Sequence, residues 1–358
     1  MINIILGGKS NALSIARSLA GLDGERHVLT TTRSGICRSS RFVDYYGCFA
    51  CSADVLEALA KYDVAAVKIL YPTSDLWARF ISDNEMQLRS MGFLFLTVAA
   101  ERMSLMLDKF LLYKAFRDIV PMPETALASC REEFTEGKAF IVKPRWSFSG
   151  DTLIDKGFRG ELEVGSDFVV QEKLSMDVRN HYSFSGLAKD GRVVFGGLTN
   201  KLLEHPAPGG TATLVVSSGV DSAWYDQALR IVKDVVSAIG YGGVFEVELI
   251  LHEGKLWFLE MNPRFWLQHE IFSLMGVNIA QAYMALCLGN PVGEPLKGKH
   301  DGLVWVHEGF WVSLLTNRYG FFDVARSLCC GKKVFAHWRI SDPRPFFVFL
   351  CEMICKRS

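Results

Sequence analysis

The first hundred residues alternate between short apolar runs and longer segments in which apolar side chains recur every three or four positions. The apolar runs predict strands at Ile2–Leu6, His27–Thr32, Val64–Tyr71 and Phe93–Thr97. The segments with helical spacing are Ser10–Leu22, Val55–Tyr62 and Leu76–Met91. Because strands and helices that alternate in this way are typical of a parallel sheet covered by helices, we predict an α/β layer here.

The pattern changes after a predicted helix at Lys109–Ile119. Gly and Ser now separate short strands, at Ala139–Lys143, Thr152–Ile154, Phe168–Gln171, Ser183–Ala188, Arg192–Leu198 and Thr213–Val216. Later elements are a helix at Ala223–Ile239, a hairpin of Val244–Leu251 with Leu256–Glu260, and a helix at Ile271–Leu288. Short strands of this kind are typical of antiparallel sheets, so this part of the chain is predicted to be α+β.

Composition narrows the functional classes. The 358 residues include 39 basic and 39 acidic side chains, so the formal net charge is zero. A neutral chain argues against nucleic acid as a partner, because binding a phosphate backbone needs a basic surplus. No apolar run reaches the roughly 18–20 residues of a membrane span, and the N-terminus does not resemble a secretion signal, which predicts a cytoplasmic protein. Nine scattered cysteines favour free thiols over a zinc site.

The opening Gly7-Gly8-Lys9-Ser10 has only a partial likeness to a phosphate-binding P-loop. A P-loop needs a glycine five residues before its second glycine, and Asn3 occupies that position within the predicted strand. We therefore interpret the two glycines as a tight turn between strand and helix.

The predicted hairpin carries the strongest chemical signal. Alternate residues of a strand share one face, so Glu246 and Glu248 point the same way. A three-residue turn at Glu253–Lys255 sets a register in which Glu248 lies opposite Glu260 and Glu246 lies opposite Asn262. Two facing carboxylates among apolar neighbours repel each other, and Mg²⁺ relieves such repulsion through carboxylate and amide oxygens. The alternative interpretation is a hairpin side that faces solvent.

Other candidate residues lie before the hairpin. Lys143 ends an apolar strand, where a lysine is unusual without an anionic partner. Lys109 opens a helix, although a structural lysine more often occupies the last turn. The alternative interpretation of each, taken alone, is a solvated lysine. The strand Phe168–Leu174 runs into polar residues that suit an adenine edge, with Glu172 near the exocyclic amine and Asp177 near ribose hydroxyls. The loop Arg145–Asp151 has the composition of a packing segment or a lid.

In this order, the motifs resemble those of the ATP-grasp superfamily. The resemblance covers about residues 1–290 and rests on Asp108-Lys109, the strand IVKP ending at Lys143 and Pro144, the segment QEKL, and Glu248 with the segment EMNPR. The stretch Asn200–Pro206 with Gly209-Gly210 is similar to the stand-alone carboxylate–amine ligase branch, which includes D-aspartate ligase-like enzymes. The implied fold is a pre-ATP-grasp parallel α/β domain followed by a two-lobed ATP-grasp fold.

The resemblance also implies a division of the chain and a role for each candidate residue. The expected units are a front domain at 1–98, a small lobe with an adenine hinge at 99–182, a large lobe with a metal site at 183–290, and an extension at 291–358. Expected ATP-binding residues are Lys109, Lys143, Gln171, Glu172, Lys173, Leu174 and Asp177. Expected magnesium ligands are Glu248, Glu260 and Asn262, and the expected catalytic residues are Arg264 and Lys201. The loop Trp146–Gly150 is poorer in glycine than in many relatives, which leaves open how it would close over phosphate.

The implied activity is an ATP-dependent ligase that joins a carboxylate to an amine through an acyl phosphate. ATP and Mg²⁺ are the expected cofactors, with two metal ions and Mn²⁺ as a substitute. The substrates would be small molecules, and one hypothesis is that an amino acid is added to a cell-envelope sugar or precursor. The alternatives are a carboxylase or other acyl-phosphate ligase, and a nucleotide-binding regulatory module without turnover.

The C-terminal tail is a separate feature. An apolar run from Phe346 to Cys355 precedes Lys356-Arg357, and about ten apolar residues are too few to span a bilayer. We interpret the run as a core helix or a homodimer helix, with an amphipathic contact to a membrane surface as the alternative.

Overall fold

The computed structural model describes most of the chain. Described are residues 1–133, 135, 137–146, 167–175, 177–206, 209–292, 302–311, 313, 325, 328–329 and 331–355. The predicted strand at 152–154, residues 147–151 of the predicted lid, and Lys356-Arg357 lie outside these ranges.

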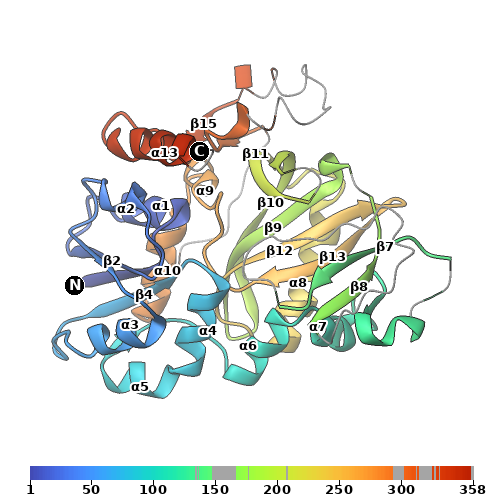
Figure 1. The fold of residues 1–358 in the computed structure, drawn as a ribbon, viewed down its shortest axis with the longest axis horizontal. Coiled ribbons are helices and arrows are strands. Elements are labelled where there is room, and N and C mark those ends of the chain that lie inside the picture. The colour runs from blue at the N-terminus through green and yellow to red at the C-terminus, as the bar shows by residue number, and fades with distance from the viewer. Residues whose placement is uncertain are drawn as a thin grey trace.

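The N-terminal part is a parallel five-stranded sheet of order β3-β2-β1-β4-β5. Its strands are β1 (Ile2–Leu6), β2 (Glu25–Thr30), β3 (Tyr45–Cys48), β4 (Lys68–Pro72) and β5 (Phe93–Leu94). Its helices are α1 (Ser10–Ser18), α2 (Gly35–Arg38), α3 (Ser52–Leu59), α4 (Asp75–Asp83) and α5 (Glu85–Ser90). The predicted α/β layer is therefore confirmed (Figure 1).

Three sequence expectations for this layer were inaccurate. The edge strand β3 was missed, because its sequence YYGC lacks an apolar alternation and only Gly47 is buried. The predicted helix Leu76–Met91 is two helices that meet at Asn84, whose side chain donates to the Phe80 carbonyl oxygen at 2.8 Å. The strand expected from Val64 begins at Lys68, because a turn precedes it.

Two further sheets follow. A three-stranded sheet of order β6-β8-β7 contains β6 (Thr125–Leu127), β7 (Phe140–Pro144) and β8 (Phe168–Glu172), all antiparallel. A seven-stranded sheet of order β13-β12-β9-β10-β11-β14-β15 contains β9 (His181–Lys189), β10 (Arg192–His205), β11 (Thr211–Ser218), β12 (Gly243–His252), β13 (Lys255–Asn262), β14 (Val304–Val306) and β15 (Lys333–Phe335). This mixed sheet confirms the predicted α+β part. The domain boundaries stay a prediction, although β14 and β15 extend the large sheet into the expected C-terminal extension.

The other α-helices with described bounds cover these sheets or connect them. They are α6 (Ala100–Leu107), α7 (Lys109–Phe116), α8 (Tyr225–Ile239), α9 (Ile271–Leu274), α10 (Ile279–Cys287) and α13 (Arg344–Cys355). The predicted helix Ile271–Leu288 is divided between α9 and α10 near Gly276, whose φ of +85° does not fit a right-handed helix. None of the described helices is long and apolar enough to cross a membrane.

The hairpin of β12 and β13 has the predicted facing pairs but a different turn. Glu253 and Gly254 both have positive φ, which makes a two-residue turn that pairs His252 with Lys255 rather than with Leu256. A register shift after Glu248 then adds one residue on β13, so Glu248 faces Glu260 and Glu246 faces Asn262. The predicted turn was wrong, and the bulge restores the predicted pairs.

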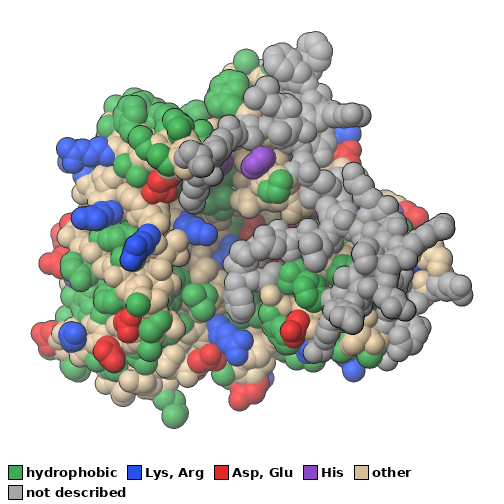
Figure 2. All heavy atoms as spheres, in the orientation of Figure 1, with side chains coloured by type: hydrophobic (Ala, Val, Ile, Leu, Met, Phe, Trp, Pro, Cys, Tyr) green, Lys and Arg blue, Asp and Glu red, His purple; other side chains and the backbone are tan. Residues whose placement is uncertain are grey.

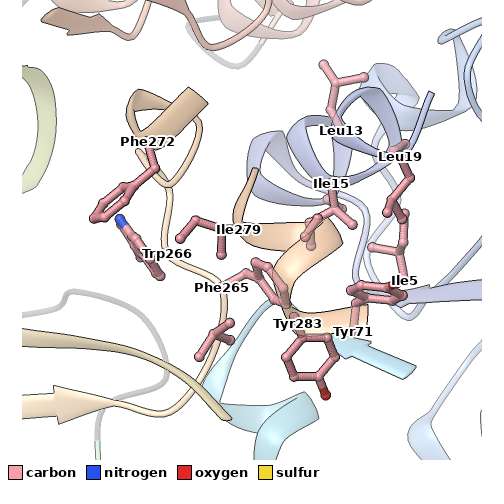
Figure 3. Close-up of a cluster of buried hydrophobic side chains, with 14 of the residues drawn as sticks. Ile5, Leu13, Ile15, Leu19, Tyr71, Phe265, Trp266, Phe272, Ile279 and Tyr283 are labelled. Atoms are coloured by element: carbon pink, nitrogen blue, oxygen red, sulfur yellow. The ribbon is translucent and has the colours of Figure 1, made fainter. Parts of the chain in front are cut away.

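A hydrophobic cluster joins the front sheet to the segment that follows β13 (Figure 3). Phe265 and Tyr283 lie against Tyr71 of β4, with ring centroids 5.9 and 5.3 Å from that ring. The Phe265 amide donates to the Pro72 carbonyl oxygen at 3.0 Å, and Asn11 donates to the Phe265 carbonyl oxygen at 3.0 Å. The chain that leaves the hairpin is thereby fixed against the front domain.

The tail helix α13 packs against α2 rather than in the core. Pro345 is its one fully buried residue, while Val348 and Phe349 are partly buried against the core cluster, so the described helix covers the core from the surface instead of lying within it. The Glu352 carboxylate accepts the Gly35 amide at 2.6 Å, and Phe349 stacks on His337 at 4.1 Å.

Candidate functional site

A cavity of about 310 Å³ lies where the three parts of the fold meet. The seven-stranded sheet supplies one wall through alternate residues of β12, which are Glu246, Glu248 and Ile250. The three-stranded sheet supplies Ile141 and Lys143 of β7. The other cavity-lining residues include Asp75, Lys109, Gln171, Glu172, Leu174, His181, Ser183, Lys201, Gly209, Gly210, Glu260, Asn262, Arg264 and Gln268.

The facing carboxylates of the hairpin open into this cavity rather than into bulk solvent. Glu248 and Glu260 are directly paired across the strands, and both line the cavity. Asn262 adds an amide whose nitrogen donates to Glu248 Oε1 at 3.4 Å. Their strand neighbours Val247 and Met261 are fully buried, so the carboxylates have one open side. The interpretation as a solvent-facing hairpin side therefore does not fit.

The two carboxylates differ in their electrostatic environment. Burial and the neighbouring charge of Glu260 raise the pKa of Glu248 to about 7. Burial also acts to raise the pKa of Glu260, but the cations Lys109, Lys143 and Arg264 outweigh it and lower that pKa. The raised pKa of Glu248 means that ionising both carboxylates in the absence of a cation is unfavourable. A divalent cation between them would stabilise the charged form of both groups.

One ion pair positions the segments that carry the two predicted phosphate lysines. Asp108 caps α7 by accepting the amides of Phe110 and Leu111, which fixes Lys109 as the first residue of the helix. The same carboxylate lies 2.7 Å from the Arg145 guanidinium, two residues after Lys143. Helix α7 and strand β7 are thereby held together at the cavity.

The lysine ammonium groups reach the cavity from these two positions. Lys109 Nζ lies 3.6 Å from Glu260 Oε2. Lys143 Nζ donates to Gln171 Oε1 at 3.0 Å, and burial lowers the pKa of Lys143. An anionic ligand would favour the charged form of such a lysine and raise its pKa.

Arg264 is held by acidic groups from helix α4 and strand β12. Its guanidinium lies 3.4 Å from Asp75 Oδ1, on the front domain, and 3.6 Å from Glu246 Oε2, on β12. Burial acts to lower the pKa of Arg264, but Asp75 and Glu246 outweigh it and raise that pKa. Gln268 also donates to Glu246 at 2.6 Å, so this corner of the cavity is a connected polar network.

The predicted adenine hinge is only partly at the cavity. Gln171, Glu172 and Leu174 line it, and Lys173 and Asp177 do not. The Asp177 carboxylate instead accepts from its neighbour Arg179 at 2.6 Å. Assignments to ATP of Gln171 through Leu174 and of Asp177 stay predictions.

Lys201 reaches the cavity from β10. Its ammonium lies 3.5 Å from Glu204 Oε2 and donates to the Gly210 carbonyl oxygen at 3.3 Å. The Gly209 amide in turn donates to Glu204 at 2.8 Å, so a carboxylate that is 1% exposed ties β10 to the residues just before β11.

Asp75, His181 and Gln268 are among the cavity residues that the sequence reasoning missed. Asp75 follows β4 at the carboxyl end of a parallel sheet, a position where ligands commonly bind, and that signal could have identified it. His181 and Gln268 gave no comparable signal. Burial, Lys201 and Lys143 lower the pKa of His181 to about 3, so its ring is neutral and adds no cation to the cavity.

The residues present fit a magnesium-bound phosphate chain. Two carboxylates and an amide supply hard oxygen ligands, and Lys109, Lys143, Lys201 and Arg264 supply cations around the same cavity. Among the described residues, no group of three or more His, Cys, Asp and Glu side chains is arranged to hold a metal. The assignment of Glu248, Glu260 and Asn262 as magnesium ligands stays a prediction.

Comparisons with known proteins bear on the fold. Residues 106–266 match the family model described as the ATP-grasp domain. A second match, to acetyl-CoA carboxylase of Dictyostelium discoideum, is 36% identical over 66 residues, which are 18% of this chain and 3% of that protein. The chain thus spans a small fraction of that relative.

Solved structures share the fold at low sequence identity. N5-carboxyaminoimidazole synthetase from Staphylococcus aureus has a TM-score of 0.66 and 13% identity, over 83% of this chain and 79% of that one. Biotin carboxylase from Campylobacter jejuni has a TM-score of 0.62 and 15% identity, over 82% and 72%. L-amino acid ligase from Bacillus licheniformis has a TM-score of 0.60 and 13% identity, over 80% and 74%. The protein thus has the ATP-grasp fold, and its residues 106–266 match the family model of the ATP-grasp domain.

Proposed function

We propose that the protein is an ATP-dependent ligase that joins a carboxylate to an amine through an acyl phosphate. The observation that carries this proposal is the facing pair of Glu248 and Glu260 in one cavity with three lysines and an arginine. Such a site concentrates positive charge and hard oxygen ligands around a triphosphate. In a hairpin with a purely structural role, two facing carboxylates would only destabilise the strand pair, because they repel each other.

The two chemical steps balance without a covalent enzyme intermediate. A substrate carboxylate oxygen attacks the γ-phosphorus of ATP, the bond to the β,γ-bridging oxygen breaks, and ADP leaves. An amine then attacks the acyl carbon, phosphate leaves with the former carboxylate oxygen, and the nitrogen loses a proton. Both steps need positioning and charge neutralisation more than nucleophilic side chains.

Each part of the cavity has a role in this scheme. Lys109 and Lys143 would bind phosphate oxygens, and Gln171 to Leu174 would hold the adenine beside the three-stranded sheet. Bound Mg²⁺, held by Glu248, Glu260 and Asn262, would neutralise charge on the phosphates.

The remaining cations serve the transferred group. Arg264 would stabilise charge on the transferred phosphoryl group, and Lys201 would contact the same phosphate. Asp75 and Glu246 keep the Arg264 guanidinium charged and oriented toward the cavity.

The amide-forming ligase is favoured over a module without turnover because the metal set and the phosphate cations occur together. The carboxylase alternative shares this machinery, and N5-carboxyaminoimidazole synthetase and biotin carboxylase are among the structural neighbours. The L-amino acid ligase neighbour has the same fold, and the stretch from Asn200 to Gly210 supports the carboxylate–amine branch. Addition of an amino acid to a cell-envelope precursor is the narrower hypothesis.

A screen of ADP release separates these activities. Purified protein with ATP and Mg²⁺ is tested against amino acids, uronic acids and their nucleotide-linked forms, singly and in pairs, with bicarbonate as a separate arm. We expect ADP to form only when a carboxylate and an amine are both present. Tight ATP binding without ADP in any arm would favour the module, and ADP release with bicarbonate alone would favour the carboxylase.

A further inference from the structure

The tail presents an exposed apolar surface that the candidate site does not use. We call it the tail patch, and it comprises Trp338, Ile340, Phe347, Cys351 and Ile354. The exposed fractions of Ile340, Ile354 and Phe347 are 88%, 66% and 56%. Large apolar side chains gathered at this level of exposure mark an interaction surface more often than chance.

The two sides of helix α13 differ in their exposure. Val348 and Glu352, one turn apart, face α2, because a Cβ added at Gly35 would lie 2.9 Å from a Val348 methyl group and Glu352 accepts the Gly35 amide. Phe347, Cys351 and Ile354 recur at helical spacing on another side, and all three are exposed. One side of the helix is therefore covered by the protein, and the apolar side is open.

Basic side chains border the tail patch. Arg33, Arg38 and Arg41 on and beside α2 are exposed, as is Arg344 at the start of α13. The acidic residues of the same segments are engaged, because Asp342 is buried against Arg17 and Glu352 is bonded to Gly35. Figure 2 shows hydrophobic side chains gathered over α13, with Lys and Arg side chains on the neighbouring front-domain surface.

We propose that the tail patch docks the protein on an anionic lipid bilayer. Aromatic and aliphatic side chains would enter the headgroup region, and the surrounding arginines would contact lipid phosphates. Lys356-Arg357 extend the basic sequence beyond the described helix. This docking is independent of the reaction proposed for the cavity.

Charge favours a bilayer over a second copy of the chain. A two-fold symmetric dimer brings the same patch of both copies together, so the arginines around one patch would face those around the other. An anionic lipid surface meets the same arginines with opposite charge. An anionic bilayer thus accounts for both the exposed apolar area and the arginines around it.

Vesicle co-sedimentation tests this docking. The full chain is mixed with vesicles of phosphatidylcholine alone or of phosphatidylcholine with phosphatidylglycerol, at low and high salt. We expect binding to the anionic vesicles only, weakened by salt because exposed charges are screened. Phe347→Glu should lower the partition by about tenfold or more, since it removes a large apolar group from the bilayer.

The matched control is Met86→Glu on α5, because Met86 is 87% exposed and lies in a different element. It should bind vesicles like the wild type. Arg344→Glu tests the charge without touching an apolar contact, and should weaken binding to anionic vesicles severalfold. Thermal melting of each variant checks that the fold is retained.

Three results would overturn the proposal. The first is the absence of vesicle binding by the wild type, and the second is equal binding to neutral and anionic vesicles. The third is a dimer in sedimentation velocity that Phe347→Glu dissociates, without any affinity for lipid.

Discussion

The carboxylate pair makes a quantitative prediction about the protein without metal. Burial and Glu260 raise the pKa of Glu248 from an ordinary value of 4.5 to about 7. A carboxyl whose pKa is raised by folding stabilises the folded state fully below pH 4.5, and this contribution is lost as the pH rises through about 7. Ionised Glu248 therefore destabilises the metal-free protein at alkaline pH.

The size of this effect follows from the pKa. A rise from 4.5 to about 7 corresponds to about 3 kcal/mol, and Glu248 is only partly buried, so solvent screening lowers this figure and we expect about 1–3 kcal/mol. Glu248→Gln keeps the oxygen that accepts from Asn262 but cannot ionise. The variant should therefore gain about 1–3 kcal/mol of unfolding free energy relative to the wild type between about pH 5 and about pH 8.5.

Urea unfolding in the presence of a chelator measures this difference. The free energy of unfolding is determined for both proteins at the two pH values, with Glu57→Gln, on an exposed position of α3, as the matched control. The control should track the wild type at both pH values. If Glu248→Gln changed stability by the same amount at both, the facing carboxylates would not be electrostatically strained and the argument for a cation would fail.

Three further predictions concern other parts of the structure. Lys143→Met should weaken ATP binding by about tenfold or more, because one charge-assisted contact to phosphate is lost, and a nucleotide titration measures it; unchanged affinity would remove Lys143 from the site. Asp342→Ala should lower the free energy of unfolding by about 3 kcal/mol in urea unfolding, because it leaves the Arg17 guanidinium buried without its carboxylate. A loss under about 1 kcal/mol would mean that the ion pair contributes little to stability. Gly254→Ala should lower the free energy of unfolding by about 1 kcal/mol, because the turn holds this residue at a φ of +74° and the added Cβ meets no other atom. A thermal melt that matched the wild type would show that the turn relaxes.

Local pattern was sufficient for the elements that carry the site. The alternation in β12 placed Glu246 and Glu248 on one face, and the apolar run before Lys143 identified β7. These strands can be predicted because burial alternates along a strand, and this alternation is visible in the local sequence alone. The facing pair of Glu248 and Glu260 followed from counting, although the turn was miscounted by one residue.

Contacts between distant segments could not be predicted from the sequence pattern. Asp75 meets Arg264 because the core around Phe265 and Tyr71 fixes the end of the hairpin against the front sheet. The tail was misread in part for the same reason, since an apolar helix can be buried or open. Only the packing of α13 on α2 showed which side stays exposed.

The most direct test of the central claim is the fate of one oxygen atom. The reaction is run with Mg²⁺, ATP, an amine and a carboxylate substrate labelled with ¹⁸O, and the released phosphate is analysed by mass spectrometry. An acyl phosphate predicts one ¹⁸O atom per phosphate released, because the former carboxylate oxygen leaves with the phosphoryl group. Unlabelled phosphate, or label in AMP instead, would contradict the proposed mechanism.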